Sequence, residues 1–406
     1  MLSQKQPLSH PMFILSCERS GSTLLRYIVD THADIACQAG LAIGALCAAL
    51  YRSAYYSVGQ AVASSEIERS SRVIEKIRQI ITALMAEYTT AKGKRLWCDK
   101  TPANLHTLDV LGTVFPDGKF ICLYRHGMDV IHSCLEISSR NGFAEEFDPY
   151  LRKYPENLTA AMVDSWTDKT GKLLAFERAN QRKCFRITYE TLVLNTVPTL
   201  EAMFAFLGLR FDPKMLDSVF RVHHDEGVGD DRIRFSKEIS KRSLGKGSKV
   251  PVEKIPSELL EKLNALLSEL NYPTVGPDWN NSPSPYLQPE TTTEERKVTT
   301  TVEEIFGGPL PVLLKRKIGR AAERGVCKFA VSGEGGGNWL INLAEQSIRK
   351  DRGELKPDCV VTVSATDFID MVSGRLNVMS AYDRGKIRVT GDGNLATKIG
   401  VLLFGT

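Results

Sequence analysis

The pattern of apolar and polar residues divides the chain into two parts with different periods. In the first part, short apolar runs alternate with stretches whose apolar residues recur every three or four positions, the period of an amphipathic helix. Met12–Leu15 is such a run, and Ser22–Ala33 follows it with a helical pattern. Further strand candidates are 95–98, 119–124 and 184–189, and the longest helical pattern is 65–90. Strand, helix, strand at these spacings predicts an α/β fold, a P-loop-like parallel sheet flanked by helices.

In the second part, apolar and polar residues alternate along four short segments, as expected for half-buried strands. These segments are 328–331, 338–343, 359–363 and 386–389. Gly333–Gly337 joins the first two as a hairpin-like turn, and 367–373 and 394–403 have helical patterns. The second part therefore predicts a smaller α+β domain with a mostly antiparallel sheet.

A segment rich in proline and threonine separates the two parts. Its prolines are Pro273, Pro277, Pro283, Pro285 and Pro289, and two runs of three threonines follow them. Because proline fixes φ and cannot donate to a strand ladder, the segment indicates an extended linker. We expect a first domain over 1–275, a linker over 276–301 and a second domain over 302–406, a division that suits a length of 406 residues.

Composition and charge exclude several classes of protein. The formal net charge of +4 is spread along the chain, whereas nucleic-acid-binding proteins usually concentrate basic residues in one stripe. No apolar run is long enough for a membrane span, the first residues lack the apolar stretch of a secretion signal, and the nine cysteines form no Cys-x-x-Cys pair. These features predict a cytoplasmic protein with no nucleic-acid partner, membrane span, disulfide framework or metal site.

The first chemically informative motif lies between the first strand and its helix. Arg19-Ser20-Gly21-Ser22-Thr23-Leu24 places a glycine and hydroxyl residues where a helix begins. The N–H groups at a helix start are unpaired, and the helix dipole favours an anion there. Gly21 allows the backbone to approach oxygens, Arg19 supplies a forked cation, and Ser22 and Thr23 are expected to cap the helix. The alternative is an ordinary turn with a serine cap; the motif is not a Walker A loop, because G-x-x-x-x-G-K-[ST] is absent.

A second anion-binding element is predicted at the end of another strand. The strand Phe120–Arg125 ends in an arginine, and the helix that follows carries Ser133 on its second turn. Ligands of open parallel sheets bind at the carboxyl ends of the strands, so Arg125 is placed to meet a second anionic group. The alternative is that Arg125 is a surface arginine in a salt bridge. This alternative explains the presence of two anion-binding loops at corresponding strand ends less well.

These two motifs and three others, in this order along the chain, resemble the sulfotransferases that use PAPS (3′-phosphoadenosine-5′-phosphosulfate), in particular the tyrosylprotein-sulfotransferase-like branch. The other motifs are Cys98–Pro102, Ile187–Val193 and Ser243–Gly247. The resemblance implies that 19–24 hold the 5′-phosphosulfate and that Arg125 and Ser133 hold the 3′-phosphate. It also implies that Tyr189 helps to hold the adenine. Four residues of the last motif would close over the nucleotide: Ser243, Gly245, Lys246 and Gly247.

The same resemblance implies that Lys100 meets the charge that develops on the leaving phosphate, unless it is an ordinary surface lysine. The resemblance carries over no catalytic base. In the tyrosylprotein branch an acidic residue after the first helix activates the acceptor, whereas the matching stretch Cys37–Leu41 has no carboxylate. His106 and His224 are the candidates, because histidine titrates near neutrality, and a structural role is the alternative for each. The missing carboxylate argues against a protein-tyrosine acceptor.

Residues 302–406 resemble the sterol-carrier-protein-2 family, on pieces such as Trp339–Leu343 and Gly385–Asp392. The resemblance implies an apolar tunnel between sheet and helices, and hence a carrier for an apolar acceptor or product. The alternative is a structural or homodimerisation module with a filled core, since a fold does not establish a function.

The sequence thus predicts a sulfotransferase that moves a sulfuryl group from PAPS to a hydroxyl or amine of a small-molecule acceptor, lipidic or a specialised metabolite, and releases PAP without a metal. A P-loop nucleotide kinase is the alternative enzyme; the missing Walker lysine and the lack of an obvious Mg²⁺ carboxylate pair count against it. The alternative from another class is a nucleotide-sensing lipid-binding protein without turnover.

Overall fold

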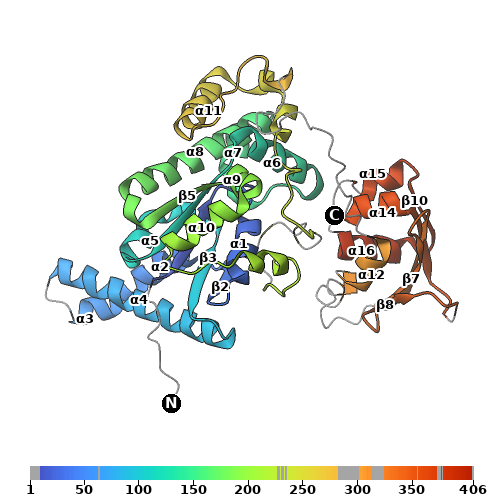
Figure 1. The fold of residues 1–406 in the computed structure, drawn as a ribbon, viewed down its shortest axis with the longest axis horizontal. Coiled ribbons are helices and arrows are strands. Elements are labelled where there is room, and N and C mark those ends of the chain that lie inside the picture. The colour runs from blue at the N-terminus through green and yellow to red at the C-terminus, as the bar shows by residue number, and fades with distance from the viewer. Residues whose placement is uncertain are drawn as a thin grey trace. The chain divides into compact units, whose positions relative to one another are not determined.

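The computed structural model describes residues 10–62, 65–225, 229, 233, 236–281, 301–308, 310–311, 314, 324–353, 355–372, 376 and 378–404. They form two compact units, a larger one made mainly by 10–281 and a smaller one made mainly by 301–404. Each unit has its own sheet and its own apolar core (Figure 1). Most of the predicted linker over 276–301 lies outside the described residues.

The larger unit is built on a five-stranded sheet in the order β2-β3-β1-β4-β5, in which every pairing is parallel. Its strands are β1 (Met12–Ser16), β2 (Ile35–Ala39), β3 (Leu96–Lys100), β4 (Lys119–Tyr124) and β5 (Cys184–Thr188). The predicted parallel sheet is confirmed. The apolar pattern did not indicate β2, because its sequence I-A-C-Q-A has one β-branched residue and its pairing with β3 defines it.

Helices cover both faces of this sheet (Figure 1). On one face α1 (Ser22–Thr31) packs against β1, β2 and β3. Phe13 and Leu15 of β1 point into the core that the helices of the other face complete. The remaining helices of this unit are α2 (Ile43–Ala54), α3 (Gln60–Val62), α4 (Glu66–Ala91), α5 (Leu108–Val114), α6 (Gly127–Asn141), α7 (Asp148–Lys153), α8 (Leu158–Ala179), α9 (Tyr189–Leu194), α10 (Thr196–Phe206) and α11 (Ser257–Glu269).

The helix α4 shows why the long helical pattern was readable in the sequence. The Ser65 side chain accepts a hydrogen bond from the N–H of Glu68 and caps the helix start. The buried positions then recur every four residues, so one stripe of the helix faces the core: Val73, Ile77, Ile81, Met85 and Thr89. No helix in the described ranges is long and apolar enough to span a membrane.

The smaller unit has a five-stranded sheet in the order β10-β9-β6-β7-β8. Its strands are β6 (Val326–Ser332), β7 (Gly337–Asn342), β8 (Ser347–Lys350), β9 (Cys359–Ser364) and β10 (Ile387–Gly391). The pairings are antiparallel except that of β6 with β9. The predicted hairpin is confirmed, because Val331 pairs with Gly337 across it, whereas β8 was not predicted.

Helices pack on this second sheet through an aromatic cluster. Phe306 stacks on Trp339 and Phe368, with ring centroids 4.4 Å and 4.8 Å apart. Such rings bury a large apolar area and pack in defined orientations, so they fix how the first helix lies on the sheet. The helices are α12 (Val302–Gly307), α14 (Ala365–Val372), α15 (Val378–Asp383) and α16 (Gly393–Phe404).

Candidate functional site

The loop between β1 and α1 has a backbone shape suited to an anion. Arg19 and Gly21 both have positive φ, 63° and 92°, and turns of this kind bring successive N–H groups together in a concavity. The helix begins at Ser22, so the position before it is Gly21, and no side chain caps the helix. The predicted cap by Ser22 and Thr23 is therefore wrong, because both residues lie inside the first turn. The alternative of an ordinary serine-capped turn is wrong for the same reason.

Gly21 is also required by its neighbour Tyr189. A Cβ atom at position 21 would lie 2.2 Å from Cδ2 of Tyr189, so no larger residue fits without movement. Tyr189 begins α9 directly after β5, and the guanidinium of Arg125 lies 4.5 Å from the centroid of its ring. The ring thus connects the loop to the end of β4, where the second anion site was predicted.

Arg125 lies directly beside the loop. Its Nη1 donates to the carbonyl oxygen of Arg19 over 2.9 Å, and its Nη2 donates to that of Ser243 over 2.6 Å. Nε of Arg19 in turn donates to Oγ of Ser133 over 3.2 Å. The structure therefore brings the two predicted anion-binding elements together at the carboxyl ends of the neighbouring strands β1 and β4.

The late glycine-containing loop is held in place by a carboxylate. Asp129, in the first turn of α6, accepts hydrogen bonds from the N–H groups of Gly245 at 2.9 Å and Gly247 at 2.6 Å. Its carboxylate lies 3.8 Å from Nη2 of Arg125. Lys246 is half-buried between the two glycines. Sequence reasoning missed Asp129, although its spacing of four from Arg125 places the two side chains together.

Lys100 forms a buried cationic site next to the loop. It ends β3 and is 2% exposed. Burial, followed by the charge of Arg26, lowers the pKa of Lys100 to about 8. Gly229 lies over it, since a Cβ atom there would be 2.9 Å from Oγ1 of Thr23 and 3.4 Å from Nζ of Lys100. Cations held close together in a buried site fit a ligand that brings negative charge.

Two buried arginines each keep a donor without a partner in the part of the chain that the structure describes. Nη1 of Arg26 donates to the carbonyl oxygens of Cys37 and Asp225, but its Nε has no hydrogen bond, and neither has Nε of Arg125. An unsatisfied buried donor is costly, so both groups fit an anionic ligand that supplies acceptors. Sequence reasoning missed Arg26, although its spacing of four from Ser22 puts it on the loop side of α1.

His106, one of the two predicted bases, ends the short 3₁₀ segment that follows Lys100. Its ring makes no hydrogen bond to any residue that the structure describes. Desolvation, followed by the charge of Lys169, lowers the pKa of His106 below its ordinary value. A histidine with a lowered pKa is neutral at pH 7, so it is able to accept a proton.

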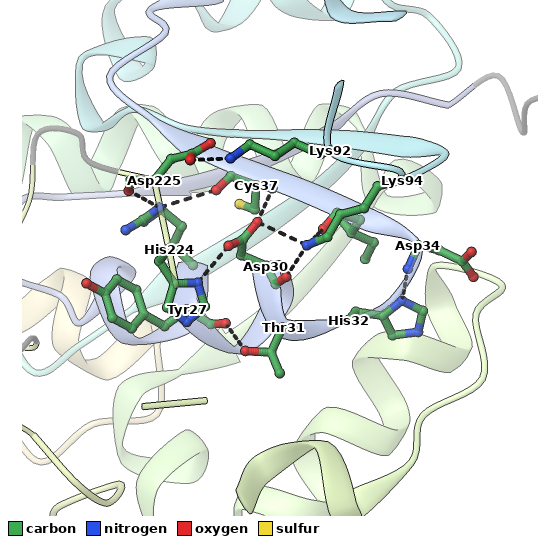
Figure 2. A network of polar contacts seen from close by, with 12 residues as sticks. Tyr27, Asp30, Thr31, His32, Asp34, Cys37, Lys92, Lys94, His224 and Asp225 are labelled. Carbon is green, nitrogen blue, oxygen red and sulfur yellow. Dashed lines mark hydrogen bonds and ion pairs between the residues drawn. The ribbon is translucent and has the colours of Figure 1, made fainter. Parts of the chain in front are cut away.

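His224, the other predicted base, lies in a separate polar network (Figure 2). Its Nδ1 is 2.6 Å from Oδ2 of Asp30, and its Nε2 is 2.8 Å from the carbonyl oxygen of Val219. Asp30 also accepts from the N–H of Cys37 and pairs with Lys94. Because both ring nitrogens are engaged, neither is left for an acceptor, and the network anchors the chain after α10 to α1 and β2.

Two family models match the chain: the sulfotransferase family over residues 11–213 and the SCP-2 sterol transfer family over residues 316–404. "Protein-tyrosine sulfotransferase 2" of Gallus gallus is 26% identical over 231 residues, which cover 56% of this chain and 56% of that protein. "Peroxisomal multifunctional enzyme A" of Dictyostelium discoideum is 40% identical over 70 residues, 17% of this chain and 16% of that protein. The chain thus spans little more than half the length of the first of these relatives.

One solved structure with a similar fold is the "Sulfotransferase Domain from the Curacin Biosynthetic Pathway". The match covers 66% of this chain and 100% of that one, with a TM-score of 0.49 and 20% sequence identity.

Proposed function

Because the chain belongs to the sulfotransferase family, we propose that its larger unit transfers a sulfuryl group from PAPS to a hydroxyl or amine of a small-molecule acceptor and releases PAP. The observation that supports this most directly is the adjacency of two anion sites, the turn at Gly21 and the buried guanidinium of Arg125, through the Arg19 carbonyl. PAPS carries a phosphosulfate at one end and a phosphate at the other. A nucleotide with one anionic group would need only one of the two sites.

In this proposal the residues described above divide the donor between them. The N–H groups and hydroxyls of Arg19–Leu24 hold the 5′-phosphosulfate. Arg125 and Ser133 hold the 3′-phosphate, and Tyr189 lies against the nucleoside. The loop Ser243–Gly247 closes over it, and its attachment to Arg125 supports that role.

The chemistry requires little covalent work from the protein. The acceptor atom forms a bond to sulfur while the bond between sulfur and the bridging phosphate oxygen breaks, and the acceptor's proton passes to a base. The ammonium of Lys100 stabilises the charge that develops on the bridging oxygen, which is worth most in a buried site. His106 receives the proton, and its exposure and lowered pKa support this assignment.

The acceptor class rests on the stretch where the tyrosylprotein branch carries its acid. Cys37–Leu41 has no carboxylate, which favours a small molecule over a protein tyrosine. The name of the relative from Gallus gallus specifies protein tyrosine, so a tyrosine side chain is the competing acceptor.

The test is to incubate the purified chain with PAPS, a panel of small alcohols, phenols and amines, and a tyrosine-containing acidic peptide, and to identify sulfated products and PAP by mass spectrometry. Sulfation of a small molecule supports the proposal, and sulfation of the peptide alone overturns the acceptor class. PAP binding without any turnover overturns the enzyme proposal in favour of nucleotide sensing. A parallel reaction with ATP replacing PAPS tests phosphoryl transfer.

For the smaller unit we propose the binding of an apolar acceptor or product, supported by its match to the SCP-2 sterol transfer family. The aromatic stack of Phe306, Trp339 and Phe368 favours a second candidate, a filled core that only packs. Native mass spectrometry of the chain with palmitate distinguishes them: a retained fatty acid supports carriage, and its absence supports the filled core.

A further inference from the structure

The loop between β1 and α1 contains a carboxylate that the proposed donor site does not explain. Glu18 directly precedes Arg19, in the loop assigned above to a polyanion, and it is 8% exposed. A carboxylate at this place repels an incoming anion, and its own burial is costly. The loop can bind a polyanion well only if another charge cancels that of Glu18.

The cancelling charge is supplied by Lys169, in the middle of α8. Its Nζ lies 2.8 Å from Oε2 of Glu18, and Lys169 is 1% exposed. Burial acts against the ammonium, but the charges of Glu18 and Cys17 and the hydrogen bond to Glu18 together outweigh it and raise the pKa of Lys169, so the lysine keeps its charge at neutral pH. The ammonium also lies 4.5 Å from the ring centroid of Phe147 and 5.6 Å from that of Tyr150, which stabilises it further.

Lys169 also fixes the position of the carboxylate. Oε2 of Glu18 accepts from Nζ of Lys169 and, at 3.6 Å, from the thiol of Cys17. Oε1 has no hydrogen-bond partner in the described ranges. The carboxylate of Glu18 therefore receives a strong charge-assisted hydrogen bond from one side only, from Lys169 of α8. Without Lys169 the carboxylate loses both its anchor and its neutralising partner, at the place where the donor's phosphosulfate arrives.

We propose that Lys169 is a positioning residue for the donor: it neutralises Glu18 so that the loop presents a positive field to the nucleotide. This inference rests on the proposed function, because it needs a polyanionic ligand at the loop. It makes donor affinity depend on a helix that lies outside the two anion-binding motifs. Its specific consequence concerns a variant that lacks Lys169. PAP binding should weaken there because Glu18 is left unpaired, and not because the lysine itself is missing.

A double-mutant cycle tests this consequence through PAP affinity, measured by isothermal titration calorimetry on the full chain. Lys169→Met should weaken PAP binding about tenfold or more, the effect expected of one uncompensated charge close to the ligand. Glu18→Gln should bind PAP at least as tightly as the parent. The double variant Glu18→Gln/Lys169→Met should recover to within about threefold of the parent, a non-additivity typical of coupled charges.

Two further measurements keep the test decisive. Removing one partner of a buried ion pair destabilises a fold, so thermal unfolding of each variant is recorded, and the double variant, which buries no unpaired charge, provides the comparison if Lys169→Met does not fold. Lys172→Met is the matched control on the same helix, because Lys172 pairs with Asp168 at the surface and should leave PAP affinity unchanged.

The outcomes separate this inference from the proposed function. A parent chain that does not bind PAP overturns the proposed function. A parent that binds PAP together with a Lys169→Met variant of equal affinity overturns the positioning role alone, and so does a double variant as weak as the single lysine variant. Loss of turnover in Glu18→Gln with unchanged PAP affinity also overturns it, because Glu18 would then act in the chemistry itself.

Discussion

The two units bury different kinds of side chain. The larger unit buries charged residues, among them Glu18, Lys100, Arg125 and Lys169, whereas none of the buried residues described in the smaller unit is polar or charged. Burying a charge costs free energy and requires a partner, so it persists mainly where the charge has a task. The difference supports the proposal that the larger unit carries the chemistry, and it shows that the described core of the smaller unit is apolar.

The strands show the same contrast. β1 is buried at every position, as in a parallel sheet covered on both faces, while β6 alternates between buried positions and half-buried or exposed ones. A sheet covered on both faces leaves its strand ends as the place where ligands reach it. The charged residues of the larger unit gather there, at the ends of β1, β3 and β4.

The largest effect that tests this contrast is a loss of packing in the smaller unit. Phe306→Ala should lower that unit's free energy of unfolding by about 3–5 kcal/mol, because it removes the ring that stacks on both Trp339 and Phe368. Hydrogen exchange of the β6–β9 peptides measures it, and Phe306→Leu, a smaller change in volume, is the control. PAP affinity should stay unchanged; a parallel loss of PAP binding would contradict the division of tasks.

The next largest effect is expected at Lys100. Lys100→Ala should lower kcat by about 10²–10³-fold, the usual loss when one group that stabilises a transition-state charge is removed. PAP affinity should change little, since the role proposed for Lys100 is to stabilise charge that develops only during the reaction. Single-turnover kinetics with saturating PAPS measure the step, and an unchanged rate would remove Lys100 from the chemistry.

A smaller effect, on binding, is expected at Arg125. Arg125→Ala should weaken PAP binding about tenfold to a hundredfold, because in the proposed function this guanidinium hydrogen-bonds the 3′-phosphate. Arg125→Lys should recover only part of this affinity, since a lysine cannot reproduce the two bonds to the Arg19 and Ser243 carbonyls. Equal PAP affinity in the alanine variant and the parent would show that the 3′-phosphate binds elsewhere.

The smallest effect is a pH dependence. The lowered pKa of Lys100, about 8, means that the free enzyme has a charged lysine below that pH and a neutral one above it. The value of kcat/KM for PAPS should therefore fall as pH rises through about 8, approaching tenfold per pH unit. In Lys100→Arg the break should disappear, because arginine stays charged throughout this range. A break that persists in the arginine variant would belong to another group.

Much of the fold could be predicted because its apolar patterns are local. β4 was predicted with its observed bounds, and α4 within a residue at each end. β2 could not be predicted, since its short sequence has a weak preference for the β conformation and forms a strand by pairing with β3. The predicted cap at Ser22 failed because the chain turns one residue earlier, at Gly21, whose φ no local pattern specified.

The candidate site could be proposed from the sequence where its residues stand in one contiguous motif, as at Arg19–Leu24. Asp129 and Lys169 were missed because they act across long distances in sequence, on the late glycine loop and on Glu18. Lys169 did leave a trace: it stands three residues after Trp166 and four before Leu173, both buried, so helical spacing puts it on an interior face. An ammonium on such a face requires a carboxylate partner.

The ring of Tyr189 lies between Gly21 and Arg125 and touches both. A smaller residue at 189 would give room for a side chain at 21, but it would remove the surface over which the guanidinium lies. A larger residue at 21 would displace the ring. These three positions can therefore vary only in concert, and in an alignment of relatives they should covary although they are far apart in the chain.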